Sequence, residues 1–275
     1  MSDLDPETRD AAPPRTPGLS SMPRTLLIGT LLHAKHLSRS PFEIALALVI
    51  PLVQATLAVY LFRAGDEPHR LLEAAVGAGL MGIWSSVLTG SGGAIQRQRW
   101  HGTLEMIMLA PRHPVLMILP ITAASAVTGT YSLLATLLWG RIVYRIPLDF
   151  RHPVAFLAAA VICVVGLSMF GLLMASTFVL LRNANALANP LEYPIWLLSG
   201  MLVPIAALPS WTVPIAAVLP TTWGARALRE ATTGGPVWPS AAICLAISAI
   251  CLTLGALFLV SFERRARAAG TLALS

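Results

Sequence analysis

The positions of the charged residues constrain this chain more than any other feature of its sequence. Six stretches contain no Asp, Glu, Lys or Arg, and each has at least 19 residues. These stretches are residues 44–62, 74–96, 113–140, 152–181, 193–225 and 231–262. Because about 20 helical residues cross the roughly 30 Å hydrocarbon core of a bilayer, each stretch is long enough for one transmembrane helix. The sequence therefore predicts an all-α integral membrane protein with six transmembrane helices.

The composition excludes a purely soluble enzyme. Hydrophobic residues make up 56% of the 275 residues and charged residues only 12%, and the mean hydropathy is +0.71. A soluble fold of this size cannot bury that much apolar surface. The uncharged stretches are continuous and rich in Leu, Ala and Gly, whereas a β-barrel needs short segments of alternating polarity, so the spanning elements should be helices.

The distribution of basic residues predicts the orientation in the membrane. An even number of spans places both termini on one side, and the positive-inside rule assigns the more basic side to the cytoplasm. Twelve Lys and Arg residues fall on the side of the termini and seven on the other side. We therefore expect both termini in the cytoplasm. The net charge of +6 then favours contact with anionic lipid headgroups rather than with nucleic acid.

Local composition divides the chain into four parts. Residues 1–21 mix acidic residues, Arg and Pro with few apolar residues, which predicts a disordered cytoplasmic tail. Residues 22–40 are expected to form an amphipathic helix at the membrane interface. Its apolar face carries Leu27, Leu31 and Ala34. Residues 41–265 make up the six-helix domain, and residues 266–275 a second cytoplasmic tail.

The fifth uncharged stretch predicts a broken segment. It has 33 residues, which is too long for one spanning helix, and it contains five Pro residues. Since Pro interrupts a helix, we expect a spanning segment from about 190 to 207. Short helices broken at Pro209 and Pro220, within residues 208–236, should then dip into the outer leaflet or lie on it.

Two short sequences predict where membrane helices begin. Ser40-Pro41-Phe42-Glu43 and Asn189-Pro190-Leu191-Glu192 each place a capping side chain before Pro at the first helical position and Glu at the third. Glu43 and Glu192 are therefore candidate functional carboxylates at the cytoplasmic rim. Because a helix N-terminus stabilises an anion by itself, capping is the favoured interpretation of both.

Small residues predict that the second stretch is a buried helix. They recur at every fourth position, which lets another helix backbone approach closely. These positions are Ala74, Ala78, Gly82, Ser86, Gly90 and Ala94.

No catalytic or metal site is indicated. The three Cys residues lie in apolar stretches without the spacing of a zinc site or a redox pair. The uncharged stretches hold no Asp or Glu, and their His residues lie at the rims, so we expect no proton relay through the helix cores. The chain also lacks the G-x-x-x-x-G-K-[ST] sequence of a P-loop ATPase. Any thermodynamic work must therefore come from another subunit.

Two segments, in this order along the chain, carry a further signal. The first reads Gln96-Arg97-Gln98-Arg99-Trp100-His101-Gly102-Thr103-Leu104-Glu105 and continues to Leu109-Ala110-Pro111. The second runs from Ser199-Gly200 through Pro204, Leu208-Pro209, Trp211 and Leu219-Pro220 to Ala227-Leu228-Arg229. Together they resemble the ABC-2 type permeases, the six-helix membrane subunits of ATP-binding-cassette exporters. The first resembles that family's charged elbow and G-T-L-E sequence, although Gln98 and Trp100 stand where acidic residues are usual. The second resembles its fifth helix and extracellular half-helices.

The resemblance implies a dimer, of identical or different permease subunits, that works with two cytoplasmic ATPase subunits in the inner or plasma membrane. ATP and Mg²⁺ would bind the partner, and this chain would hold no cofactor. The coupling segment would be residues 96–114. The residues implied to act in coupling are Arg97, Arg99, Trp100, His101, Gly102, Thr103 and Glu105.

The resemblance also places substrate contacts at the dimer interface, between the first and fifth helices. The candidates there are Gln54, Thr56, Tyr193, Trp196 and Met201. An amphiphilic drug or natural product is favoured over a polysaccharide or lipid-linked glycan, because a glycan path would need stacked aromatic rings and only 7% of the chain is aromatic. Two other classes remain open. One is an integral membrane enzyme, such as an intramembrane hydrolase or lipid transferase, and the other is a sensory or structural membrane subunit.

Overall fold

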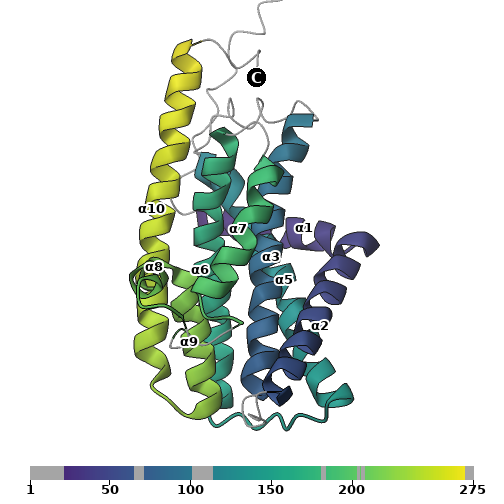
Figure 1. Cartoon of the computed structure of the whole chain (residues 1–275). Helices are drawn as coiled ribbons and strands as arrows, with labels where there is room; N and C mark the ends of the chain where they lie inside the picture. Colours follow the sequence, from purple (N-terminus) through teal and green to yellow (C-terminus); the bar gives the residue numbers. More distant parts are fainter. Residues whose placement is uncertain are drawn as a thin grey trace, which may run out of the picture.

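The computed structural model of the chain describes residues 22–64, 71–100, 114–180, 184–202, 205 and 208–269. Every regular element in that part is a helix, which confirms the predicted all-α class for the described residues (Figure 1). The helices are α1 Met22–Leu37, α2 Pro41–Ala64, α3 Leu71–Trp100, α5 Pro114–Val143, α6 Pro153–Leu180, α7 Ala184–Leu198, α8 Thr212–Val218, α9 Pro220–Thr233 and α10 Val237–Ala269.

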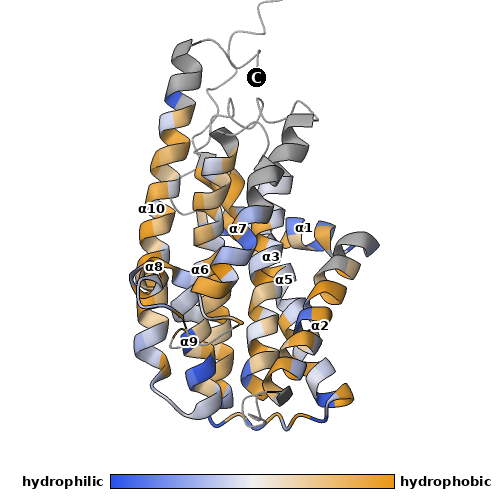
Figure 2. Ribbon diagram, in the orientation of Figure 1, coloured by the Kyte–Doolittle hydropathy of each residue, from blue (hydrophilic) through white to orange (hydrophobic). Residues whose placement is uncertain are grey.

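Four of the described helices are long and apolar enough to cross a membrane, so the chain is a membrane protein. They are α3, α5, α6 and α10, and their apolar parts are Leu71–Gly93, Val115–Val143, Pro153–Phe178 and Val237–Phe262. Figure 2 shows hydrophobic residues along most of the length of α10. α2 carries a shorter apolar part, Ala47–Phe62. The number of six spans and the cytoplasmic termini stay predictions.

α7 ends earlier than the sequence predicts. We expected a segment from about 190 to 207, whereas the helix ends at Leu198. Gly200 adopts a φ of 70°, in the left-handed region that favours glycine. The Met201 N–H donates to the Trp196 carbonyl at 3.2 Å, which closes the turn after the helix. A glycine turn, and not one of the later prolines, therefore ends this helix.

α7 also begins earlier than predicted. Its first residue is Ala184, so Pro190 and Pro194 lie inside it. Each Pro removes one backbone N–H donor from the helix without ending it. The prediction that Asn189-Pro190-Leu191-Glu192 starts the fifth helix is wrong for this reason. The matching prediction for Ser40-Pro41 is confirmed, because α2 begins at Pro41.

The segment after α7 contains two short helices, as expected. Leu219 separates α8 from α9 with an extended conformation, and Pro220 then occupies the first turn of α9. α9 packs against α6 and α10 in the lower half of Figure 1. Gly234, with a φ of 89°, ends α9 and turns the chain toward α10.

α3 forms the centre of the bundle. It packs against α2, α5, α6, α7 and α9, and Trp84 on it is fully buried. The Trp84 ring stacks on Phe170 of α6, with 5.1 Å between the ring centroids. The three cysteines are buried and unpaired, as expected for small apolar side chains.

Small residues allow α3 and α5 to lie unusually close. A Cβ added at Gly90 would lie 2.6 Å from the Ser125 Cβ, and one added at Gly129 would lie 2.8 Å from the Ile83 Cα. A Cβ added at Gly82 would lie 2.6 Å from the Cγ of Pro51 on α2. The described part of the predicted small-residue stripe therefore serves close helix packing.

α1 lies across the long helices (Figure 1). It contacts α5, where Gly29 faces Pro120, and none of its residues is buried. Leu27 and Leu31, from the predicted apolar face, are exposed. Such a face is typical of a helix that rests in a membrane interface.

Candidate functional site

A cavity of about 270 Å³ lies among α2, α3, α5 and α7, next to the junction of α1 and α2. One wall is apolar and consists of Leu37, Ile44, Ala47, Ile50 and Pro51. The rest is mainly polar and consists of Ser38, Gly82, Ser85, Ser86, Thr89, Gly90, Ser125, Thr128, Tyr131 and Glu192. A cavity with hydroxyls on one side and hydrocarbon on the other can hold an amphiphilic molecule.

Most hydroxyls of the cavity come from one face of α3 and one face of α5, and Ser38 lies just after α1. Ser85 and Thr89 are one turn apart on α3, and Ser125 and Thr128 are about one turn apart on α5. Because glycines bring the two helices together, these side chains converge beside α2. The sequence does contain these hydroxyls at helical spacing within two apolar stretches, but we did not identify them as a candidate site from the sequence.

Most of these hydroxyls have already donated their hydrogen. Thr89 Oγ1 donates to the Ser85 carbonyl at 2.6 Å, and Thr128 Oγ1 lies 3.1 Å from the Ala124 carbonyl that accepts its hydrogen. Ser125 Oγ donates in the same way to its own helix. A hydroxyl has one hydrogen, so what it offers to a ligand after such a bond is acceptor lone pairs.

Among the residues whose side chains the structure describes, Glu192 is the only charged one that lines the cavity. Its Oε1 accepts a hydrogen bond from Ser85 Oγ. Within the described part of the chain, Ser85 is its single hydrogen-bonding partner, and no basic side chain forms an ion pair with it. The carboxylate is half-buried.

The position of Glu192 corrects a sequence-based expectation. Ser85 lies 14 residues after Leu71 and eight residues before Gly93, in the apolar part of α3. At about 1.5 Å per residue, the Glu192 carboxylate therefore sits roughly 12 Å inside that span. It is not a capping group at the rim, because α7 starts six residues earlier than we expected.

The end of α7 is held by α3 and α9. The Met201 carbonyl lies against Gly77 of α3, at a position where any side chain would collide with it. Arg229 of α9 donates to the carbonyls of Gly200 and Met201. α7 and α3 are therefore antiparallel, with Glu192 beside Ser85 and Met201 beside Gly77, and this packing fixes where Glu192 lies.

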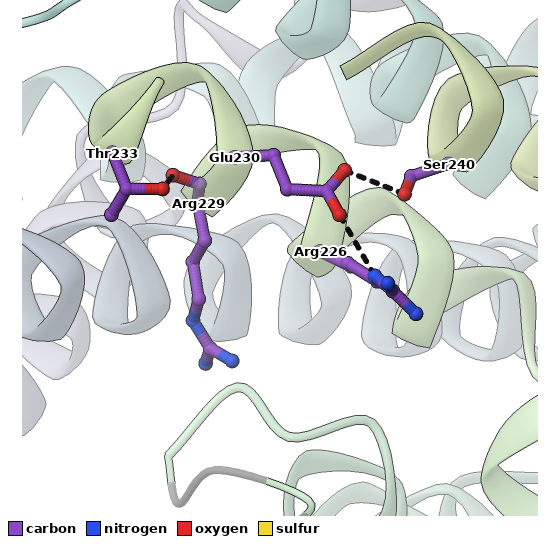
Figure 3. Close-up of polar contacts among 5 residues, drawn as sticks. All are labelled: Arg226, Arg229, Glu230, Thr233 and Ser240. Carbon is purple, nitrogen blue, oxygen red and sulfur yellow. Dashed lines mark hydrogen bonds and ion pairs between the residues drawn. The ribbon is translucent and has the colours of Figure 1, made fainter. Parts of the chain in front are cut away.

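A second carboxylate on the opposite side of the bundle has a different environment. Glu230 Oε1 accepts from Arg226 Nε at 2.9 Å, and Glu230 Oε2 accepts from Ser240 Oγ at 2.6 Å. Figure 3 shows both contacts and shows that the Arg229 side chain points away from them. This network ties α9 to α10.

Four of the five predicted pathway residues lie on the expected helices, Met201 follows the end of α7, and none of the five lines the cavity. Gln54 and Thr56 are on α2, and Thr56 Oγ1 accepts a hydrogen bond from Trp139 Nε1 at 3.1 Å. On α7, Tyr193 is exposed and Trp196 is buried, and Met201, in the turn after α7, is buried as well. α2 and α7 do border one cavity, through other residues. Contact of these five residues with a substrate stays a prediction.

The predicted coupling residues lie at and beyond the end of α3. Arg97, Arg99 and Trp100 are in its last turn, and their side chains fall outside the described part. His101, Gly102, Thr103 and Glu105 also lie outside the described residues. α3 is continuous from Thr89 on the cavity wall to Trp100.

The described residues contain no group of three or more His, Cys, Asp or Glu side chains that could hold a metal ion. The chain matches the model of a family described as ABC-2 type transporter over residues 27–232, which are 206 of the 275 residues. The match extends from α1 into α9. No curated protein matches the chain.

Proposed function

The chain belongs to the ABC-2 type transporter family, and we propose from that premise that it is the transmembrane permease subunit of an ABC exporter. Membership makes it a membrane component that works with an ABC ATPase. The observation that carries the proposal is the family match across most of a chain whose described part is a helical membrane bundle. The polar cavity inside that bundle supports a transport role.

In this proposal two permease subunits span the plasma or inner membrane, each six times and with cytoplasmic termini. Two ATPase subunits bind ATP and Mg²⁺ on the cytoplasmic side. ATP binding and hydrolysis switch the permease dimer between inward and outward access. The exported substrate is an amphiphilic drug or natural product, since the cavity pairs hydroxyls with an apolar wall.

We propose that α3 carries the force. The coupling segment, residues 96–114, begins in the last turns of α3, and Ser85 and Thr89 on the same helix line the cavity. α3 is an unbroken helix between the two sites. A displacement of its cytoplasmic end therefore moves two cavity side chains relative to α2 and α5.

Co-purification with a candidate ATPase subunit tests the proposal. We expect a stable complex whose ATPase activity, in nanodiscs, rises with some members of a small panel of amphiphilic compounds. If the chain binds no ABC ATPase, or the ATPase never responds to a compound, the proposal is wrong.

Substitutions in the coupling segment test the coupling assignment. Glu105→Ala and Arg99→Ala should each leave the chain inserted and folded but remove compound-stimulated ATPase activity and transport. Arg264→Ala is a matched control, because it removes a basic side chain near the end of α10, far from the segment in sequence. Transport at the wild-type rate by both coupling variants would contradict the assignment.

A further inference from the structure

The Glu192 carboxylate borders the cavity, and no basic side chain among the described residues pairs with it. A charged group among membrane helices is costly unless it is paired or well hydrogen bonded. Within the described residues, Glu192 has one hydrogen bond, from Ser85. The carboxylate has two oxygens that can accept several hydrogen bonds. The site therefore has room for a positively charged donor.

The hydroxyls around Glu192 point to the same kind of ligand. The hydroxyl hydrogens of Ser125, Thr128 and Thr89 bond to backbone carbonyls, so these groups face the cavity as acceptors. A protonated amine brings N–H donors and a positive charge. Ser86 and one hydroxyl of the Ser38–Tyr131 pair can still donate. A phosphate or a carboxylate would nevertheless face the Glu192 carboxylate and these acceptors, which disfavours anionic glycans and phospholipid phosphates.

The size of the cavity excludes a bare ion as its complete occupant. A volume of about 270 Å³ corresponds to roughly nine water molecules at about 30 Å³ each. The wall formed by Ile44, Ile50 and Pro51 is apolar. An organic cation that carries a hydrocarbon group satisfies both walls.

We propose that this cavity binds the protonated amine of an amphiphilic molecule and that Glu192 is its counter-ion. The inference rests on the proposed function and makes it more specific, because it names a cationic substrate class. Ser85 orients the carboxylate, and the hydroxyls of α3 and α5 accept the remaining N–H groups.

A binding experiment tests whether the cavity requires a positive charge. It compares two ligands that share the same alkyl tail, one with a protonated amine and one neutral. The purified full chain in nanodiscs of phosphatidylcholine and phosphatidylglycerol is titrated with a fluorescent alkyl amine and with its N-acetylated, neutral analogue. The wild type should bind the amine at least about tenfold more tightly, as expected for one charge-assisted hydrogen bond. Glu192→Gln should remove this preference and leave binding of the neutral analogue unchanged. Glu73→Gln, at the other end of α3, should retain it.

A second variant keeps the test informative if Glu192→Gln fails to fold. Thr89 is exposed and lies one turn from Ser85, so Thr89→Lys should place an ammonium group beside Glu192. This variant should bind the amine at least about tenfold more weakly than the wild type does, because the new ammonium group already pairs with Glu192. An unchanged preference for the amine in Thr89→Lys would overturn the inference.

Lipid composition distinguishes the two sources of an amine. If phosphatidylethanolamine in the nanodisc competes with the amine ligand in the wild type and not in Glu192→Gln, a lipid headgroup occupies the site. Absence of competition assigns the site to a soluble amphiphile. Equal binding of amine and neutral analogue by the wild type overturns the inference, whereas the ATPase measurements on the complex test the proposed function separately.

Discussion

Glu192 and Glu230 are both carboxylates inside the helical bundle, and their surroundings are opposite. Glu230 accepts from Arg226 and Ser240 and joins α9 to α10. Only 14% of its side chain is exposed. Glu192 accepts from the Ser85 hydroxyl alone among the described residues and borders a cavity.

The comparison separates a carboxylate that holds helices together from one that is available to a ligand. The α6, α9 and α10 side satisfies the charge of Glu230 internally, and Glu230 does not line the pocket that lies there between the first residues of α6 and of α10. The α2, α3, α5 and α7 side leaves a negative charge and several acceptors facing an open volume. Buried charge without an internal partner is a common mark of a functional site in a membrane.

The largest effect should come from filling the contact between α3 and α5 on the cavity side. Gly129→Ala places a Cβ about 2.8 Å from the Ile83 Cα, in helix backbone that cannot move aside cheaply. We expect a loss of about 1–3 kcal/mol in the free energy of unfolding. Gly140→Ala is the control, because its Cβ would meet the end of the Ile146 side chain at 3.2 Å and the Ala75 Cβ at an ordinary 3.6 Å, with no backbone atom in the way. Equal thermal stability of the two variants in nanodiscs would contradict this packing.

The next effect tests the two carboxylates directly. Glu230→Gln removes an ion pair and weakens the bond from Ser240, so it should cost about 1–2 kcal/mol; Arg226 is largely exposed and contributes the smaller part. Glu192→Gln should change stability by less than about 0.5 kcal/mol, because the amide still accepts from Ser85 and an unpaired charge is removed. Chemical unfolding of both variants in the same micelles measures the difference. A larger loss for Glu192→Gln would reverse the roles that we assign.

The smallest effect concerns His33 on α1, whose last turn borders the cavity. Burial lowers the pKa of His33 below its ordinary value of 6.5, and the neighbouring His36 lowers it further. The folded state therefore binds this proton less readily than the unfolded state. The stability contribution is present above about pH 6.5 and is lost as the pH falls below it.

We expect faster hydrogen exchange in α1 at pH 5.5 than at pH 7.5, after correction for the intrinsic exchange rate. His33→Gln should abolish this pH dependence. His152→Gln, just before α6, should leave it unchanged. A pH dependence that survives in His33→Gln would assign it to another group.

The sequence predicts the spans well where charge and hydropathy alone decide them. The uncharged stretches 74–96, 113–140, 152–181 and 231–262 coincide with α3, α5, α6 and α10. Because a helix surrounded by lipid must be long and uncharged, the sequence alone shows where such helices lie. The close approach of α3 to α5 was visible too, because small residues repeat at helical spacing.

The candidate site was much less predictable. The Asn189-Pro190 sequence has the form of a helix start, but α7 begins at Ala184, so that Glu192 lies in its third turn. Sequence spacing does not show that Ser85 of α3 faces Glu192, 107 positions later. The five pathway candidates were chosen by residue type on or next to α2 and α7, whereas the lining of the cavity depends on which face each helix turns inward.

The most direct test of the account is ATP-dependent uptake of the fluorescent alkyl amine into inside-out vesicles that contain this chain with its ATPase partner. We predict that uptake requires both the partner and ATP. It should be lost in Glu192→Gln and absent with the neutral analogue. Equal uptake by vesicles that contain this chain alone, or by the wild type and Glu192→Gln, would contradict this prediction.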